Sequence, residues 1–272
     1  EIDAPLLAMM AAGLSGVVSA KVPGYMGGKD RTPRPDAPDS SYVEPMSDQI
    51  SDLDDGTRTD RTTVKRLPER GHYDRETIDA ILDEAIMCHV GTVEDGVPMV
   101  IPTLHARDGD HLLIHGSAAA RMLRTARTQQ ICVTVTLVDG FVLARSGMHH
   151  SMNYRSVVLL GQPELVEGDD KVRALDRIVE QLVPGRLEQL APRPMTDKEI
   201  RATSVLRLPI TEASAKVRTG PPSDDAEDYD LPIWAGVLPI TTTYGPPITD
   251  PGMTQDIEVP ANIADYRRPT TS

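Results

Sequence analysis

Apolar and polar residues repeat first with a helical period and then with a strand period, and the change falls near residue 87. Upstream of it, apolar residues recur every three to four positions, which is the spacing of one helix face. Asp74 comes directly before them and is a good N-cap residue. We therefore expect an amphipathic helix after Asp74. Its apolar stripe comprises Ile78, Ile81, Leu82, Ala85 and Ile86.

Short apolar runs rich in β-branched residues follow this helix. Three Asp-Gly pairs, at 95–96, 108–109 and 139–140, separate neighbouring runs. Because Asp-Gly supplies the positive φ that tight hairpin turns need, the pattern predicts an antiparallel meander with a hairpin at each pair. The predicted strands are 88–93, 99–106, 112–115, 131–137, 141–145, 154–160, 164–166, 204–210 and 215–219.

Helical patterns interrupt these strands at three places. Ser117 is predicted to cap a helix that runs from Ala118 to about residue 127. A second amphipathic pattern, 172–182, ends at a Pro-Gly pair, and Thr196 and Glu199 have the spacing of a capping box. An antiparallel sheet of many short strands removes its edges by closing on itself. The predicted fold is therefore mainly β (α+β), a barrel of roughly six strands with flanking helices.

Three regions differ in composition. Residues 24–55 are rich in Pro, Gly, Ser and Asp, so we expect residues 1–57 to form an extended arm. Within it, the apolar stretch 4–20 is shorter than the ~20 residues that span a bilayer, and we expect no direct membrane span. Residues 1–45 are a candidate docking segment for a protein partner. The barrel domain is predicted over 58–240 and an irregular tail over 241–272.

The charge and the cysteines exclude several classes of protein. The net charge is −13, from 41 acidic and 28 basic residues, and nucleic-acid binding needs a basic surface instead. Cys88 and Cys132 are too few for a zinc site or a disulfide framework. They predict reduced core residues and a cytoplasmic protein. No phosphate-binding loop or dinucleotide fingerprint is present.

Two segments carry the residue types of an anion site. In 115–121, a strand is expected to end at His115, a glycine turns the chain at 116, and a helix begins at Ser117. Helix N-termini favour anions, and Arg121 lies one turn further on. Lys216 and Arg218 share one strand face, ~6.6 Å apart, which suits a phosphate or a carboxylate. A capped helix with a surface arginine and a charged edge strand are the alternatives.

The histidines do not have the spacing of a metal site. His149 and His150 are adjacent and point opposite ways on an extended chain. His111 and His115 share a strand face but lie ~13 Å apart. We therefore predict no metal site.

Several segments, in order along residues 58–240, resemble the pyridoxamine 5′-phosphate oxidase-like flavin-binding split-barrel family, which includes 5-nitroimidazole reductases. The matching segments are 59–71, 100–103 (Val-Ile-Pro-Thr), 115–118 (His-Gly-Ser-Ala), 149–157, 215–222 and 234–237. The resemblance implies an antiparallel split β-barrel, usually a homodimer, with FMN at the subunit interface. A planar ring system needs a partner surface to exclude water from a shallow barrel face.

The resemblance also implies roles for individual residues. Val100, Pro102 and Thr103 would lie along the flavin ring, and His115 would lie near it. Gly116, Ser117 and Arg121 would surround the phosphate, to which Lys216 and Arg218 would contribute. Asn153 belongs to a loop that would come from the other subunit. No catalytic acid or base is predicted, because hydride chemistry belongs to the cofactor.

Three functions follow from this resemblance. The first is an FMN-dependent oxidoreductase that reduces a small molecule in the manner of a nitroreductase, with electrons from a nicotinamide cofactor. The second is a flavin-binding or degenerate accessory subunit, docked to a larger complex through the N-terminal arm. The third is a protein that holds a deazaflavin or a haem in the same slot.

Overall fold

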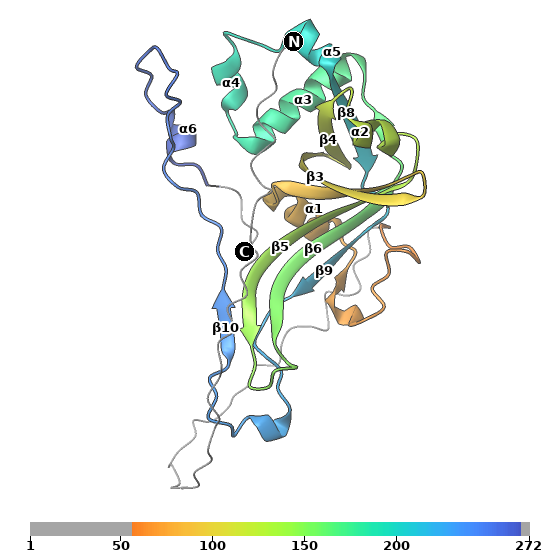
Figure 1. The fold of residues 1–272 in the computed structure, drawn as a ribbon, viewed down its shortest axis with the longest axis vertical. Coiled ribbons are helices and arrows are strands. Elements are labelled where there is room, and N and C mark those ends of the chain that lie inside the picture. The colour runs from red at the N-terminus through yellow and green to blue at the C-terminus, as the bar shows by residue number, and fades with distance from the viewer. Residues whose placement is uncertain (1–55, 268–272) are drawn as a thin grey trace. The chain divides into compact units, whose positions relative to one another are not determined.

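The structure, a computed structural model, describes residues 56–267 (Figure 1). Ten strands in this part of the chain form one antiparallel sheet, which confirms the predicted mainly-β fold. The predicted docking segment 1–45 lies outside the described residues. The strands are β1 (Gly71–His72), β2 (Met87–Glu94), β3 (Val97–Asp108), β4 (His111–Ser117), β5 (Ile131–Leu143), β6 (Ser151–Gly161), β7 (Glu164–Leu165), β8 (Thr203–Pro209), β9 (Ala213–Arg218) and β10 (Gly236–Pro239).

Helices connect the strands and flank the sheet. The first helix begins where the sequence predicts, because the Asp74 side chain accepts a hydrogen bond from the Thr77 N–H at 2.7 Å. None of the helices in the described part is long and apolar enough to cross a membrane. The helices are α1 (Arg75–Glu84), α2 (Arg121–Ala126), α3 (Gly168–Leu182), α4 (Arg186–Leu190), α5 (Asp197–Ala202) and α6 (Ala261–Ala264), with 3-10 turns η1 (Pro68–Arg70) and η2 (Ala226–Asp228).

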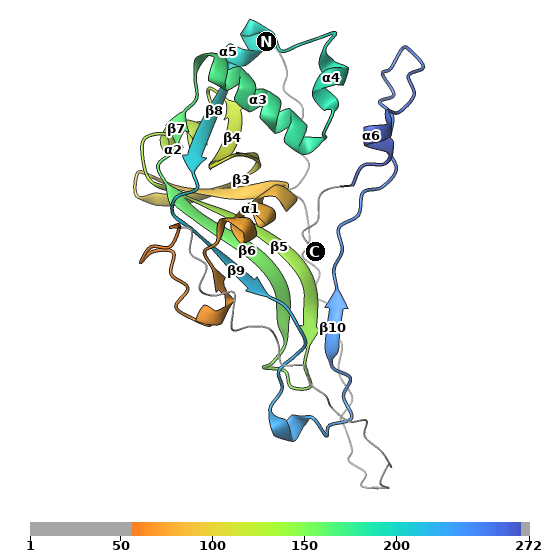
Figure 2. The same ribbon diagram turned by 180° about the vertical axis from the view of Figure 1, so that it is seen from behind.

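The order of the strands makes the sheet a split barrel. Hydrogen bonds link them as β1-β9-β6-β5-β2-β3-β4-β8-β7, and β10 pairs with β5 beside this path. β9 lies near one end of this order, beside β6, and β8 lies near the other end, beside β4. Only residues 210–212 join β8 to β9 (Figure 2). The Leu160 N–H donates to the Glu212 carbonyl at 2.9 Å, and the Ile210 N–H donates to the Asp110 carbonyl at 2.8 Å. This crossover brings both parts of the path around one interior.

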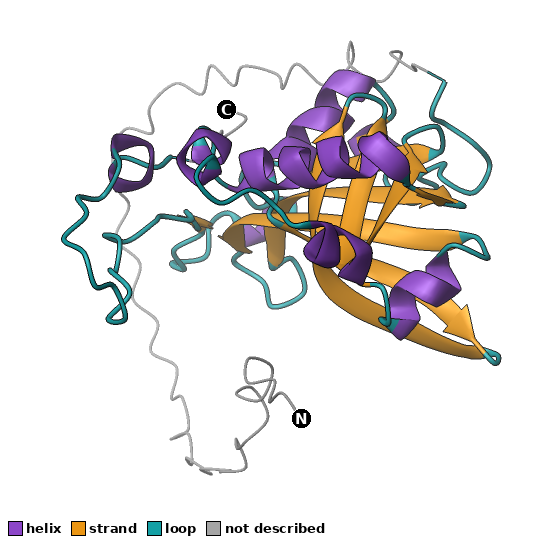
Figure 3. Cartoon of the chain, turned by 90° about the horizontal axis from the view of Figure 1, so that it is seen from above, coloured by secondary structure: helices purple, strands orange, loops and turns teal. Residues whose placement is uncertain are grey.

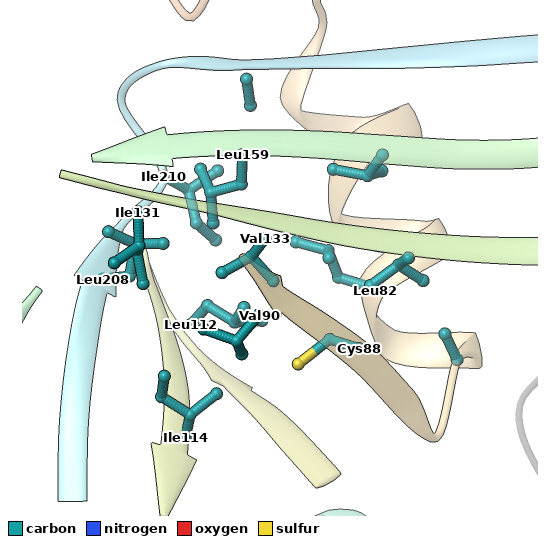
Figure 4. Packing of buried hydrophobic residues seen from close by; sticks show 14 of the residues in the cluster. Leu82, Cys88, Val90, Leu112, Ile114, Ile131, Val133, Leu159, Leu208 and Ile210 are labelled. Atoms are coloured by element: carbon teal, nitrogen blue, oxygen red, sulfur yellow. The ribbon is translucent and has the colours of Figure 1, made fainter. Parts of the chain in front are cut away.

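The interior is filled by aliphatic side chains from both parts of the path. Leu112, Leu208 and Ile210 come from the β4–β8 part and point toward Val133 and Leu159 of the β5–β6 part (Figure 4). All five are almost fully buried. Because burial of a large aliphatic side chain contributes about 1.5–3 kcal/mol, this shared cluster holds the two parts together.

A second, smaller core lies between α3 and the outer face of the β3–β4–β8 part. Ala174, Leu175 and Ile178 of α3 pack with Leu113 and Val205 of the strands. Figure 3 shows helices lying against the outside of the strands. The α3 stripe was predicted from its helical spacing, and its partners are the strand residues that alternate with the interior ones. One face of these strands therefore packs into the barrel interior, and the opposite face packs against α3.

Two of the three predicted hairpins are confirmed. Asp95 and Gly96 have φ of 48° and 79°, as a tight β2–β3 turn requires, and Gly109 has φ of 56° in the β3–β4 turn. The third prediction, a hairpin at Asp139-Gly140, is wrong. β5 continues through this pair with a bulge between Val138 and Gly140.

The continuation of β5 is explained by a partner far along the chain. β10 pairs with its second half, and Gly140 lies opposite Pro239. A Cβ on Gly140 would stand 2.9 Å from the Leu238 carbonyl oxygen, so the glycine allows the close approach of β10. The Asp-Gly pair thus marks a bulge rather than a turn.

The cysteines are free thiols, as predicted. Cys88 is fully buried and Cys132 is half-buried. Burial raises the pKa of the Cys88 thiol to about 12 and raises the pKa of Cys132 as well.

Candidate functional site

The residues predicted to bind a cofactor fall into two groups on different parts of the sheet. β5 and β2 lie between β6 and β3 in the strand order, so the groups are about 14 Å apart along the sheet at the usual spacing of about 4.8 Å per strand. The structure does not unite them within one chain. Group one, on β3, β4 and α2, comprises Val100, Pro102, Thr103, His115, Gly116, Ser117 and Arg121. Group two, on β6 and β9, comprises Asn153, Lys216 and Arg218.

Group one includes an open apolar strand face. Val100 is 62% exposed, although it lies within β3 and pairs with β2, and Pro102 is exposed as well. Thr103 on the neighbouring position is half-buried. Two β2 residues, Gly91 and His89, pair with Val100 and Pro102. An exposed apolar strand face of this kind fits a flat ligand or a second protein surface.

Met87 and His89 share this side of β2 and were not among the predicted site residues. They alternate with Cys88 and Val90, which are fully buried in the core. Met87 is 50% exposed, and His89 is exposed and pairs with Thr134 of β5 as well as with β3. Residues 88–93 were predicted as a buried strand. The alternation of side chains along a strand is the signal that separates the outward Met87 and His89 from the inward Cys88 and Val90.

His115 lies on β4 and is half-buried. Its Nδ1 atom is buried and has no hydrogen-bond partner in the described part of the chain. Burial lowers the pKa of His115, so the imidazole is neutral at pH 7. Gly116 beside it makes room for Leu123 of α2, whose Cδ1 would lie 3.1 Å from a Cβ at this position. His115 therefore offers one neutral, unpaired ring nitrogen.

The helix predicted to begin at Ser117 begins later. Ser117 is the last residue of β4, and α2 starts at Arg121 with Ala120 as its N-cap. The Ala118 N–H donates to the Ala202 carbonyl at 2.8 Å, which keeps the chain extended after Ser117. Ser117 Oγ instead accepts from the Ala119 N–H at 3.2 Å. The prediction of a serine-capped helix at this point is wrong.

Arg121 is exposed and already paired. Its Nε lies 3.0 Å from Glu94 Oε2 at the end of β2. The pair connects the start of α2 to the β2–β3 hairpin, so part of the positive charge predicted for an anion is balanced within the chain.

Group two forms a basic patch in an acidic protein. The Arg218 guanidinium is buried and donates a hydrogen bond to Asn153 Oδ1. Burial and the nearby Arg70 lower its pKa. The Asn153 side-chain amide donates to the Gly220 carbonyl at 3.1 Å, and Lys216 Nζ donates to the Arg66 carbonyl at 3.2 Å. The positive charges are balanced here by carbonyl dipoles rather than by carboxylates, which favours an anionic ligand.

Three potential metal ligands meet near the start of β6, although no metal site was predicted. Ligand atoms of His149, Asp224 and Asp228 lie within 4.8 Å of one another. Asp224 accepts hydrogen bonds from the Arg145 side chain at 3.0 Å and from the Arg145 N–H at 2.9 Å. Because the guanidinium stands where a cation would be attracted, the cluster is explained as an ion-pair network.

A cavity of about 890 Å³ opens beside the outward face of β2 and β5. Its inner wall comes from the end of α1, from β2 and from β5, and its outer wall comes from the segment after β10. The lining residues are Glu84, Ala85, Ile86, Met87, His89, Thr136, Leu137, Thr242, Thr243, Tyr244 and Arg267.

The chain is similar to several solved structures. Flavocytochrome Anf3 from Azotobacter vinelandii is 48% identical, with 77% of this chain and 97% of that chain covered at a TM-score of 0.73. An FAD and haem binding protein from Mycobacterium smegmatis is 37% identical, with coverages of 72% and 96% and a TM-score of 0.69. A Bacteroides thetaiotaomicron protein named for 5-nitroimidazole antibiotic resistance is 25% identical at a TM-score of 0.46, over 54% and 86%, which is too distant to bear on function.

No curated protein sequence matches the chain. The family model described as pyridoxamine 5′-phosphate oxidase matches residues 74–217, which is more than half of the 272 residues and covers the sheet from β2 through most of β9. This match, together with the split barrel, shows that the chain belongs to the pyridoxamine 5′-phosphate oxidase family.

Proposed function

We propose that the protein is a flavin-binding redox protein that holds its flavin on the outward face of β2 and β3 and reduces a small molecule there. The observation that carries this proposal is the open apolar face around Val100, which lies within a strand that the family match covers. The described chain does not cover this face, and a flat tricyclic ring fits it. The similarity to a flavocytochrome and to an FAD and haem binding protein supports the same assignment.

FAD is the flavin that we favour over FMN. The Mycobacterium smegmatis relative is named for FAD, whereas the resemblance in the sequence implied FMN. Both flavins present the same ring and at least one phosphate, so both need an apolar slot and a basic patch. The FAD pyrophosphate spreads its negative charge over two phosphate groups, which suits the two separate cations Lys216 and Arg218.

We further propose that the flavin site is completed by a second copy of the chain. Group one offers the apolar face and group two the basic patch, and β5 and β2 separate them within one chain. In a homodimer, group two of one copy reaches the phosphates of a flavin whose ring lies on group one of the other. Such a crevice excludes water from the ring, as redox cofactor sites require.

The flavin, when bound, supplies hydride transfer, with a nicotinamide cofactor as electron donor. The chain contributes binding and orientation. The backbone of β3 at Val100–Thr103 positions the ring edge, and His115 supplies a neutral ring nitrogen near it. The free thiols Cys88 and Cys132 support the predicted cytoplasmic location, where cysteines stay reduced.

The full-length protein, purified as expressed, tests this proposal. We expect the visible absorption of an oxidised flavin in stoichiometric amount, and mass spectrometry of the released ligand distinguishes FAD, FMN and deazaflavin. Lys216→Gln should weaken flavin binding about tenfold or more, because a hydrogen bond to a charged group contributes about 1.5–3 kcal/mol. Lys198→Gln on α5, an exposed lysine that belongs to neither group, is the matched control.

Protein that carries no flavin, and that binds none when FAD or FMN is added, would overturn the proposed function. An equal loss of binding in the Lys216 and Lys198 variants would contradict the role of the basic patch. A flavin that binds but accepts no electrons from a nicotinamide cofactor would indicate the accessory role instead.

A further inference from the structure

Exposed apolar side chains lie next to one another across three strands, β10, β5 and β6. Leu238 of β10 lies opposite Phe141 of β5, and Phe141 lies opposite Met152 of β6. Residues that lie directly opposite each other point to the same face of a sheet. Leu238 is 54% exposed, Phe141 49% and Met152 41%, so the described chain leaves these side chains open to solvent.

Trp234 extends this row of side chains beyond β10. Gly236 and Leu238 lie two positions apart on β10 and therefore share one face. A Cβ on Gly236 would stand 2.9 Å from Trp234 Cζ2, so the indole lies over the glycine on that face. Trp234 is 69% exposed and is the sole tryptophan of the chain. Together, Trp234, Leu238, Phe141 and Met152 form a surface that we call the apolar stripe.

The apolar stripe lies on the same face of the sheet as the basic patch. Side chains alternate along β6, so Met152 shares its face with Ser156. Ser156 lies opposite Lys216 of group two on one side and opposite Thr136 of β5 on the other. The second copy that completes the proposed flavin site would lie over this face and would reach the apolar stripe as well.

The segment that contains β10 carries no charged side chain. Residues 231–249 lack Asp, Glu, Lys and Arg, although 25% of the residues in the chain are charged. β10 pairs with β5 along one edge, and no strand in the described part of the chain pairs with its second edge. Exposed edge strands usually carry charged residues, which prevent other chains from adding to the sheet. An uncharged edge beside an apolar stripe therefore favours a covered surface.

A second copy of the chain fits this surface better than a charged partner does. Each copy has a net charge of −13, so two copies repel each other least where their contact is free of charge. A two-fold interface joins the same patch of both copies, and an apolar patch is complementary to itself. We propose that the apolar stripes of two copies pack against each other around a two-fold axis. This inference extends the two-copy part of the proposed function and does not depend on the flavin.

Trp234 allows a direct test, because no other tryptophan contributes to the fluorescence. We expect the full-length protein, as purified, to sediment as a dimer and to show the blue-shifted emission of a buried indole. Dilution to the monomer should shift the emission to the red and increase its quenching by acrylamide. Phe141→Glu should raise the Kd of the dimer about a hundredfold, because a two-fold interface buries the new carboxylate twice.

Two further variants serve as controls. Leu165→Glu places the same charge on β7, where Leu165 is 37% exposed at the other end of the strand order, and this variant should keep the dimer and its emission. Phe141→Leu keeps the stripe apolar and should dimerise nearly as tightly as the wild type. The circular dichroism of all three variants should match the wild type, because both substituted side chains are exposed in the single chain.

The outcomes separate this inference from the proposed function. A dimer with the emission of a solvent-exposed indole would overturn the inference, because its interface would lie elsewhere. A monomer with a buried indole would overturn it too, since another part of the chain would then cover the stripe. A Phe141→Glu dimer as tight as the wild type would have the same meaning. A dimer with the expected emission but without flavin would support the stripe and overturn the flavin function alone.

Discussion

At the scale of single residues, the alternation of β2 separates two kinds of chemistry. Cys88 and Val90 point into the aliphatic core, whereas Met87 and His89 point outward to the cavity. A shift of one position in register would place the imidazole in the core and the thiol outside. The pairing of β2 with β3 and β5 therefore decides which of these residues can meet a ligand.

Burial should make Cys88 unreactive in the native protein. Because its pKa is raised to about 12, very little thiolate forms at pH 9, and iodoacetamide should modify Cys88 only slowly until the protein unfolds. The contribution of Cys88 to the free energy of unfolding should be fully present below pH 9 and should be lost as the pH rises toward 12, since the unfolded thiol ionises first. Peptide mass spectrometry measures how much of each thiol is labelled in the native and unfolded protein, with the half-buried Cys132 as the comparison. Rapid native labelling of Cys88 would contradict the packing of the core.

At the scale of elements, local caps determine where helices begin. The capping box of α5 joins Thr196 and Glu199 in both directions, and its spacing was visible in the sequence. The predicted start of α2 at Ser117 was wrong because β8 and the end of α5 hold the chain extended: Ser117 pairs with Thr203, and Ala118 bonds to Ala202. A capping residue alone therefore does not fix a helix start when a strand competes for the same backbone.

Removal of the α5 cap should destabilise the protein by about 1 kcal/mol, because Thr196→Ala leaves the Glu199 N–H without its acceptor. Thermal or denaturant unfolding measures the change, and Thr254→Ala in an exposed segment is the matched control.

The pH gives a second readout of this cap. Arg193 and Thr196 lower the pKa of Glu199 to about 2, so its contribution is present above pH 4.5 and is lost as the pH falls toward 2. Equal stability of Thr196→Ala and Thr254→Ala would show that the α5 cap does not contribute.

At the scale of the whole molecule, the separation of the two residue groups predicts that each flavin site uses two copies of the chain. A Val100→Glu copy would have a defective apolar face, and a Lys216→Gln copy would have a defective basic patch. In a mixed dimer, one site combines both defects and the other has neither. We therefore expect each variant alone to lose flavin and mixed dimers to recover about half of the sites.

Co-expression with two affinity tags isolates the mixed dimers, light scattering gives their mass, and flavin absorption gives their occupancy. Monomeric protein that binds flavin fully, or mixed dimers without recovery, would contradict the two-copy site.

Much of the fold follows from signals within a few residues. The Asp74 cap, the α3 stripe and the Asp-Gly turns at 95–96 and 108–109 were predicted because each depends on local backbone conformation and side-chain spacing. The family resemblance could also be seen along 58–240. The strand positions of Val100, Pro102, Thr103, His115, Lys216 and Arg218 followed from the same patterns. Gly116, Ser117 and Asn153 were predicted outside strands but lie on β4 and β6, and the partition into two groups was not predicted.

The sequence by itself determined β2 to β4 and β6 to β9, the caps of α1 and α5, and the family, because caps, turns and alternation act over short distances. Only the tertiary structure decided that β5 passes through Asp139-Gly140, that Arg155 joins Glu84 to Asp139, and that Met87 and His89 line a cavity closed by residues 242–244 and 267. Each of these depends on contacts between distant segments. Such contacts form because burial and hydrogen bonding of the whole chain are optimised together, and no local pattern specifies the partner.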